Sequence, residues 1–368
     1  MQLNTLSLVN FKNYSQLKVD FTKGIHCFLG RNGSGKTNLL DAIHYLSFTK
    51  SAFNSTDSQN VKHGEDHFVI RGEFSFVESE RSVSCSFQNQ KKTVRVDEKE
   101  IMKLSKHIGE YPVVLVGPND IELIWNGSAL RRKFFDSMIS QMDADYLKHL
   151  IIYMQALRQR NSLLKMYASR DLDRDILESY NQKLIYSGTE IFKKRTAYAG
   201  KFLPLLKRHY KALSGNASED VHIMYKSELL EMDFESILNK NLQRDRLLQR
   251  TTTGIHRDDF VFLLDDVDLK RFGSQGQQKS FLIALKLSEF QMIQERKGFK
   301  PILLLDDIFD KLDDFRIQHL LEMINQQSFG QLFITDARPY RSRQLLKESG
   351  TDVTLFRVDK GALKSVSA

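Results

Sequence analysis

One glycine-rich stretch constrains this chain more than any other feature. Residues 30–37 read Gly-Arg-Asn-Gly-Ser-Gly-Lys-Thr and fit the pattern G-x-x-x-x-G-K-[ST] at every required position. The apolar run Ile25–Leu29 precedes the stretch, and apolar residues at helical spacing follow it. Strand, glycine-rich loop and helix form the context in which backbone N–H groups wrap around a polyphosphate. A glycine-rich turn that fits the pattern by chance is the alternative, and it does not explain these flanks.

We expect residues of this loop to bind ATP together with Mg²⁺. Lys36 would reach the β- and γ-phosphates, and the Thr37 hydroxyl would be a Mg²⁺ ligand. The residues expected to bind the nucleotide here are Gly30, Arg31, Asn32, Gly33, Ser34, Gly35, Lys36, Thr37 and Asn38.

Charge and cysteine content narrow the class of protein. The chain has 368 residues, enough for two or three domains. Its formal net charge of +8 favours an anionic partner such as nucleic acid, although an ordinary basic soluble protein can carry the same charge. Two cysteines are too few for a disulfide scaffold. Because neither a signal peptide nor a run of membrane-helix length is apparent, we expect a cytoplasmic protein without membrane contact.

The first part of the chain predicts a mixed β lobe around the nucleotide. Residues 1–30 predict two strands, and residues 36–48 predict a helix. Between residues 67 and 116 several segments alternate or are rich in β-branched residues, and Val113–Val116 closes this series.

Helical spacing dominates from about residue 128. We expect Pro204 to kink or break the helical stretch of residues 174–213. A hairpin with Asp265 and Asp266 at its turn is expected to return the chain to the β core. The predicted domains are an α/β head of residues 1–127 and 251–368 and an inserted helical arm of residues 128–250.

Asp306 and Asp307 end the apolar run of residues 302–305 and predict the second half of the ATP site. Asp306 would hold Mg²⁺ directly or through water, while Asp307 would position or deprotonate the attacking water. Asp307 and Lys36 are therefore the predicted catalytic residues, and Thr37 and Asp306 the predicted metal ligands. The alternative is a polar strand end that meets a helix N-terminus.

Residues 272–279, Phe-Gly-Ser-Gln-Gly-Gln-Gln-Lys, resemble the signature motif of ABC ATPases. In that class a serine and a glycine at a helix start contact the γ-phosphate of nucleotide bound to the opposite subunit. The resemblance implies that Ser274, Gly276 and Gln277 bind the nucleotide of a second copy, in an ATP-dependent homodimer. A polar loop that only caps a helix is the alternative.

Two later segments extend this resemblance. Residues 309–313 resemble the D-loop, and residues 332–336 stand where ABC ATPases place a switch histidine. Because no histidine occurs there, Thr335 and Asp336 remain the candidates for sensing the γ-phosphate. The order of the motifs is that of ABC-type ATPases in the branch that contains the SMC proteins, and it implies an ABC-type ATPase head with a P-loop NTPase core.

Nearly the whole chain resembles the RecF family of bacterial DNA replication and repair proteins. The segment Gly-Ile-His-Arg-Asp-Asp at residues 254–259 is similar to the family's GPHRDD, with Ile255 in place of proline. The D-loop residues Lys311-Leu312-Asp313 depart from the more usual SELD. Further similar segments are residues 6–14, 116–124, 131–136, 153–161, 272–278 and 303–307.

The resemblance implies a slow, DNA-stimulated ATPase that binds DNA as a dimer and releases it upon hydrolysis. Its DNA would be single-strand gaps and duplex–single-strand junctions, and its partners RecO and RecR, with which it would help to load RecA.

Cations in the predicted arm favour DNA binding independently of that resemblance. Phosphate contacts from such residues would be salt-dependent and largely independent of sequence. The candidate DNA-binding residues are Arg131, Arg132, Lys133, Arg158 and Arg160, and further cations stand at Lys193, Lys194, Arg195, Lys207 and Arg208. A solvated helical face paired with acids is an equally simple interpretation of any one cluster.

Two other functions fit parts of the pattern. A structural assembly factor would bind ATP to dimerise and hydrolyse almost none. A transporter's nucleotide-binding subunit would pair with separate membrane chains, but the switch histidine expected of such a subunit is missing.

Overall fold

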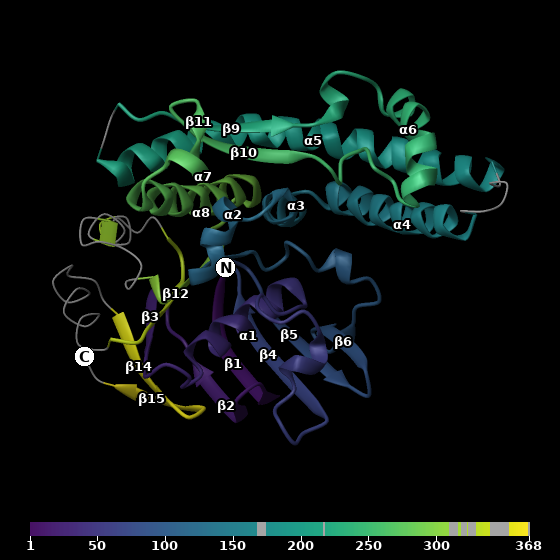
Figure 1. Ribbon diagram of the computed structural model, residues 1–368. Coiled ribbons are helices and arrows are strands. Elements are labelled where there is room, and N and C mark those ends of the chain that lie inside the picture. The colour runs from purple at the N-terminus through teal and green to yellow at the C-terminus, as the bar shows by residue number, and fades with distance from the viewer. Residues whose placement is uncertain are drawn as a thin grey trace. The chain divides into compact units, whose positions relative to one another are not determined.

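The chain folds into two units, each built around its own β-structure (Figure 1). The computed structural model describes residues 1–167, 174–215, 218–308, 316–317, 322, 329–338 and 353–366. The first unit comprises residues 1–120, 209–215 and 279–368, and the second comprises residues 121–208 and 216–278. The predicted boundaries of the head and arm stay a prediction.

An antiparallel six-stranded sheet of order β2-β1-β4-β5-β6-β7 forms one layer of the first unit. A tight turn at Lys12 and Asn13 joins the first two strands and pairs Phe11 with Tyr14. The chain before residue 30 therefore contains three strands, and the prediction of two is wrong. The strands of this sheet are β1 (Gln2–Phe11), β2 (Tyr14–Asp20), β4 (His67–Ser75), β5 (Glu80–Gln88), β6 (Lys91–Val96) and β7 (Lys99–Glu100).

A second six-stranded sheet, of order β15-β14-β3-β13-β12-β8, is parallel except for β15. Because the carboxyl ends of parallel strands meet at one edge, this sheet brings the P-loop and the tandem acids to the same edge. Its strands are β3 (Ile25–Leu29), β8 (Val113–Val116), β12 (Ile302–Asp306), β13 (Leu332–Asp336), β14 (Val353–Asp359) and β15 (Ala362–Val366).

Helix α1 (Lys36–Phe48) packs against strands of both sheets. Its apolar residues, among them Leu39, Ile43 and Leu46, are fully buried in one core with Leu6 of β1 and Leu304 of β12. Such burial on all sides is expected of a helix between two apolar layers. The prediction of a helix over residues 36–48 is confirmed.

The second unit combines helices with a three-stranded sheet of order β11-β10-β9. Asp265 and Asp266, at φ 47° and 63°, form the predicted turn between β10 and β11. The hairpin nevertheless pairs with β9 of this unit and does not join either sheet of the first, so that part of the prediction is wrong. The elements are α2 (Glu122–Trp125), α3 (Ser128–Met142), α4 (Ala144–Met166), β9 (Val221–Lys226), α6 (Phe234–Leu248), β10 (Asp259–Leu264), β11 (Val267–Asp268) and α7 (Leu269–Phe272).

Two long helices have residues in both units. Helix α5 (Arg174–Ser214) runs through Pro204, so a break at Pro204 is wrong, and a kink there stays a prediction. The side chains of Phe202, Leu206 and Tyr210, on either side of the proline, are fully buried. Such burial favours the helix, whereas the proline removes one of its backbone hydrogen bonds. Helix α8 (Gln275–Lys297) begins within the signature motif. None of the described helices combines the length and the apolar character needed to cross a membrane.

Candidate functional site

The P-loop joins β3 to α1 in a conformation that depends on glycine. Gly33 and Gly35 have φ of 77° and 114°, the left-handed region that L side chains rarely adopt. Lys36 is buried, and its ammonium donates to the carbonyls of Gly30 and Arg31 at 2.9 and 3.2 Å. Arg31, Asn32 and Gly33 are exposed, whereas Ser34 is buried and its hydroxyl has no hydrogen-bond partner among the described residues.

The tandem acids lie beside the loop, as the parallel sheet requires. Asp336 at the end of β13 pairs with Leu29 of β3, and its carbonyl accepts from Gly30 N at 3.3 Å. On the other side of β13, Thr335 pairs with Asp306 of β12. The site is therefore assembled from the ends of three adjacent strands.

Asp306 receives two hydroxyl hydrogen bonds on one oxygen. Thr37 Oγ1 donates to Asp306 Oδ1 at 2.9 Å, and Thr335 Oγ1 donates to the same atom at 2.7 Å. Burial raises the pKa of Asp306, and the two hydroxyl donors oppose that rise. The structure thus brings both predicted metal ligands, Thr37 and Asp306, into direct contact.

The donor set at Thr37 and Asp306 fits Mg²⁺. Both side chains offer hard oxygen atoms, and Mg²⁺ is usually held by one or two such groups together with water and substrate phosphates. No group of three or more His, Cys, Asp or Glu residues suited to a metal occurs in the described part of the chain. A metal site ligated only by such side chains is thus not found among the described residues. The oxygen atoms of Thr37 and Asp306 suit a Mg²⁺ ion that arrives with a nucleotide.

Asp307 has a backbone that few residues adopt. Its φ is 47°, and its N–H donates to Thr335 Oγ1 at 3.0 Å. Aspartate tolerates the left-handed region better than most residues, and such conformations cluster at functional sites. Thr335 therefore contacts both predicted acids, a relationship that the sequence did not reveal. Of the two switch candidates, Asp336 is also buried, and its Oδ1 accepts from Arg338 N at 2.6 Å.

The signature residues form a helix cap in the second unit. Ser274 precedes α8, and its hydroxyl accepts from Gln277 N at 3.2 Å. Gln277 Oε1 in turn accepts from Ser274 N at 2.7 Å, which completes a capping box. Gly276 lies within this first turn. Ser274 remains exposed, so the same helix N-terminus is accessible to an anion. The predicted D-loop lies outside the described residues.

The structure uses several predicted DNA-binding cations internally. Arg160 is fully buried, and its Nη1 lies 2.7 Å from Asp245 Oδ2, so the prediction that it contacts DNA is wrong. Arg131 donates to both carboxylate oxygens of Asp259 at 2.8 and 2.9 Å. Arg132 donates to the carbonyl of Asp258 at 2.5 Å. These arginines hold the second unit together.

Four of the further cations named from the sequence, all on α5, are also paired. Arg195 is buried and contacts Asp136 and Asp258 at 2.9 and 3.0 Å. Lys194 lies 2.7 Å from Asp143, and exposed Lys193 lies 2.8 Å from Glu190. Lys207 bonds Asp220 at 2.8 Å. For most of these α5 cations, the interpretation as side chains paired with acids is therefore the better one.

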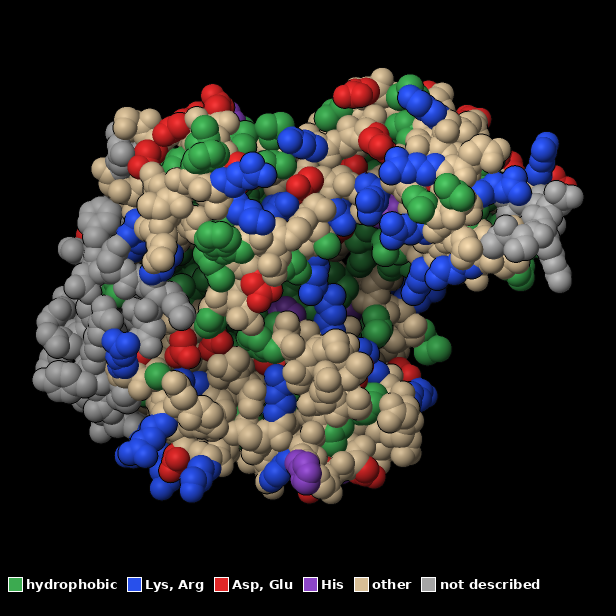
Figure 2. All heavy atoms as spheres, viewed as in Figure 1, with side chains coloured by type: hydrophobic (Ala, Val, Ile, Leu, Met, Phe, Trp, Pro, Cys, Tyr) green, Lys and Arg blue, Asp and Glu red, His purple; other side chains and the backbone are tan. Residues whose placement is uncertain are grey.

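Exposed cations gather instead on α4 and α6. Figure 2 shows lysine and arginine side chains over these helices, at the right of the view. Arg158 and Lys133 of the predicted set are exposed. The exposed cations are Lys148, Arg158 and Lys165 of α4, Lys240, Arg244 and Arg246 of α6, and Arg250 just beyond α6. The cations of α6 and Arg250 were missed, although three arginines within seven residues of the predicted arm were a visible signal.

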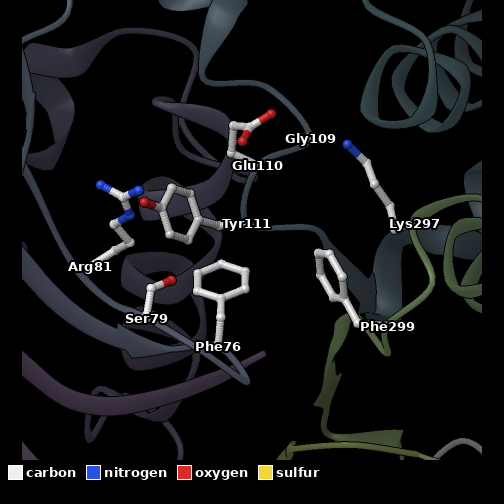
Figure 3. A pocket seen from close by; sticks show the side chains of 8 residues that line it. All are labelled: Phe76, Ser79, Arg81, Gly109, Glu110, Tyr111, Lys297 and Phe299. Atoms are coloured by element: carbon white, nitrogen blue, oxygen red, sulfur yellow. The ribbon is translucent and has the colours of Figure 1, made fainter.

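A separate pocket of about 220 Å³ lies in the first unit (Figure 3). Phe76, Tyr111 and Phe299 line it, with Arg81 and Lys297 on opposite sides of the rings. None of its lining residues belongs to the predicted nucleotide site, so ATP is not assigned to this pocket.

Comparisons with known proteins agree with the geometry. The sequence matches the model of the RecF/RecN/SMC N terminal domain over residues 2–354. It is 46% identical over 360 residues to the DNA replication and repair protein RecF of Flavobacterium johnsoniae, covering 97% of this chain and 100% of the relative. It is 43% identical over 365 residues to RecF of Cytophaga hutchinsonii, covering 99% and 97%.

Solved structures extend the likeness to the fold. A structure of the recombination mediator protein RecF with ATPrS, described as part of the RecFOR pathway, superposes with a TM-score of 0.89 at 30% identity, over 100% of this chain and 98% of that one. An Smc head bound to a domain of ScpA gives a TM-score of 0.57 at 14% identity over 100% and 98%, and shows the fold alone. The predicted α/β ABC-type ATPase head with a helical insert is confirmed, and the chain belongs to the RecF family.

Proposed function

We propose that this protein is an ATP-dependent DNA-binding protein of recombinational repair and replication restart, and that it acts in the cytoplasm. The strongest support for this function is the chain of hydrogen bonds that joins the phosphate loop to both predicted acids. Thr37 contacts Asp306, and Thr335 contacts both Asp306 and Asp307. The similar structure of the recombination mediator protein RecF with ATPrS, described as part of the RecFOR pathway, supports the nucleotide and the repair pathway in this proposal.

Each residue of the site has a proposed role in hydrolysis. The P-loop N–H groups and Lys36 bind the phosphates, and Asp307 orients the attacking water and accepts its proton. Thr37 and Asp306 hold Mg²⁺, which when bound neutralises charge that develops on the phosphates. Ser274, Gly276 and Gln277 of a second copy contact the same nucleotide.

Nucleotide binding would thus form a homodimer that clamps DNA, and hydrolysis would release it. We place its DNA at single-strand gaps and duplex junctions, where with RecO and RecR it promotes RecA loading. The exposed cations of α4 and α6, together with Lys133, are the proposed phosphate contacts.

Parallel measurements of DNA affinity and dimerisation test this function. We expect tight DNA binding and a dimer with ATP, and weak binding and a monomer with ADP or without nucleotide. Equal DNA affinity in all three states would contradict the clamp. Absence of hydrolysis despite ATP-dependent dimerisation would favour the assembly factor.

A further inference from the structure

Three consecutive residues of the turn between β1 and β2 bond to the P-loop and α1. Lys12 Nζ lies 2.6 Å from Asp41 Oδ2 of α1. Asn13 Nδ2 donates to the Ser34 carbonyl, and Tyr14 Oη to the Gly35 carbonyl, each at 3.0 Å. This turn precedes the P-loop in sequence by about twenty residues, and the spacing of the motif gives no sign of the contact.

The orientation of the Asn13 amide is fixed. Asn38 Nδ2 donates to Asn13 Oδ1 at 2.7 Å, which leaves the Asn13 amino group to face the Ser34 carbonyl. Gly361 N donates to that same carbonyl at 3.2 Å. The Ser34 carbonyl is thus held by two donors, one from each of two separate hairpins.

Planarity carries this restraint to the opposite side of the loop. In a trans peptide unit the carbonyl and the following N–H point in opposite directions. Because Asn13 and Gly361 hold the Ser34 carbonyl on their side, the Gly35 N–H points to the other side. The Gly35 carbonyl accepts from Tyr14 and also from Leu39 N at 3.2 Å, so the Lys36 N–H is directed in the same way.

The close approach of the turn also explains the glycine at position 35. A Cβ there would lie 2.4 Å from Asn13 Nδ2 and 2.9 Å from Tyr14 Oη. The turn is firmly anchored, since Asp41 is fully buried and Lys12 N donates to the Asn60 carbonyl at 2.8 Å. Tyr14 is fully buried too. Displacement of the Asn13 or the Tyr14 side chain would therefore break its hydrogen bond to the P-loop.

We propose that Asn13 and Tyr14 are positioning residues for the phosphates of ATP. They act through the Ser34 and Gly35 peptide units, whose N–H groups they aim at the phosphates, and do not touch the nucleotide themselves. This inference rests on the proposed function, because it assumes that the P-loop binds ATP. It assigns to the β1–β2 turn a part in the affinity of the site for polyphosphate.

Calorimetric titration with Mg²⁺-ATP and with Mg²⁺-tripolyphosphate tests the inference, because tripolyphosphate carries no base or sugar. In Asn13→Asp a carboxylate oxygen replaces the donor and faces the Ser34 carbonyl. We expect this variant to lose about tenfold or more in affinity for both ligands by the same factor. Tyr14→Phe removes one hydroxyl, and we expect it to lose roughly threefold to tenfold for both.

Matched controls exist in the same unit. Asn54 donates to Asn60 Oδ1 at 2.9 Å in a similar Asn–Asn pair, and buried Tyr45 donates to Asp57 at 2.6 Å. Neither pair contacts the P-loop, so Asn54→Asp and Tyr45→Phe are expected to keep both affinities within about twofold. Thermal unfolding without nucleotide identifies a variant that fails to fold. If Asn13→Asp fails to fold, the affinities of Tyr14→Phe test the inference.

Two outcomes would overturn the inference alone. One is unchanged affinity of both folded variants for both ligands. The other is a loss for ATP without a loss for tripolyphosphate, which would mean that the side chains contact the nucleoside. Failure of the wild-type protein to bind ATP at all would overturn the proposed function and this inference with it.

Discussion

Thr335 Oγ1 donates a hydrogen bond of 2.7 Å to Asp306 Oδ1, across the pair of adjacent strands β13 and β12. The same hydroxyl accepts from Asp307 N, so one atom restrains the proposed metal ligand and the proposed general base. Thr335 is fully buried, which keeps solvent from competing for either bond.

Replacement of Thr335 by valine should slow hydrolysis while leaving ATP binding nearly intact. Valine keeps the shape and removes the hydroxyl, so Asp306 loses a donor and Asp307 N loses its acceptor. We expect kcat for ATP to fall by about tenfold to a hundredfold, with Kd changed by less than about threefold. Thr335→Ser keeps the hydroxyl and should retain most of the activity. Equal losses in the serine and valine variants would contradict this role.

Lys36→Ala and Asp307→Asn should separate binding from chemistry. Loss of the ammonium removes a charge-assisted contact, so Lys36→Ala is expected to weaken ATP binding by at least about tenfold. Asp307→Asn retains the phosphate contacts but cannot accept a proton, and its hydrolysis is expected to fall by about a hundredfold or more. Fluorescent-nucleotide titration and phosphate release measure the two effects. Unchanged phosphate release in Lys36→Ala would refute the assignment of the P-loop.

Substitutions of Arg158 and Arg160 should have very different effects on stability and DNA affinity, although only two positions separate these residues on α4. Arg160→Met leaves Asp245 buried without its ion-pair partner, so the free energy of unfolding should fall by about 3–5 kcal/mol. Arg158→Ala changes an exposed side chain, so stability should change by less than about 0.5 kcal/mol. DNA affinity of Arg158→Ala should instead fall, with a salt dependence weaker by about one phosphate contact.

Chemical denaturation and DNA titration at several salt concentrations check this pair. A folded Arg160→Met protein of wild-type stability that had lost DNA binding would restore the original sequence prediction for Arg160.

Glu289 on α8 should make stability fall as pH rises. Burial raises its pKa to about 7, while Lys286, 3.6 Å away, opposes the rise and Asp120 adds to it. The folded state therefore holds the proton more tightly than the unfolded chain does. The resulting stabilisation is complete below the unfolded pKa of 4.5 and is lost as pH approaches 7.

Glu289→Gln should remove this pH dependence, because an amide does not titrate. Between pH 4.5 and above 7, the stability of the wild type relative to the variant is expected to fall by about 3 kcal/mol. Urea unfolding at stepped pH measures the difference, and exposed Glu295→Gln on the same helix is the control. A constant difference across the range would count against a raised pKa.

The sequence predicted the parts of the site that are contiguous along the chain. The P-loop with α1 and the acids after β12 are each set by a local pattern of strand, turn residues and helix. Thr335 could be placed only as a switch candidate, because its contacts with Asp306 and Asp307 follow from the register of β13 on β12. Asn13 and Tyr14 lay in a segment with a recognised resemblance, yet no spacing rule linked them to Ser34 and Gly35.

Burial explains the errors among the charged residues. Arg158 and Arg160 look alike in the sequence, and only tertiary packing assigns Arg160 to Asp245, Asn181 and Thr251. The hairpin at Asp265 was recognised from its turn residues, but its partner β9 stood inside a stretch expected to be helical. Strand partners far apart in sequence are a property of the fold that local patterns do not carry.

The strand order β15-β14-β3-β13-β12-β8 has a consequence for folding during synthesis on the ribosome. The loop near residue 30 takes its supports from the turn at Asn13, from Asp306 and Asp336, and from the hairpin at Gly361. A chain still emerging from the ribosome contains the P-loop long before it contains the hairpin at Gly361. The hydrogen bond from Gly361 N to the Ser34 carbonyl can therefore form only after residue 361 has been translated, and a product truncated before that residue lacks this support.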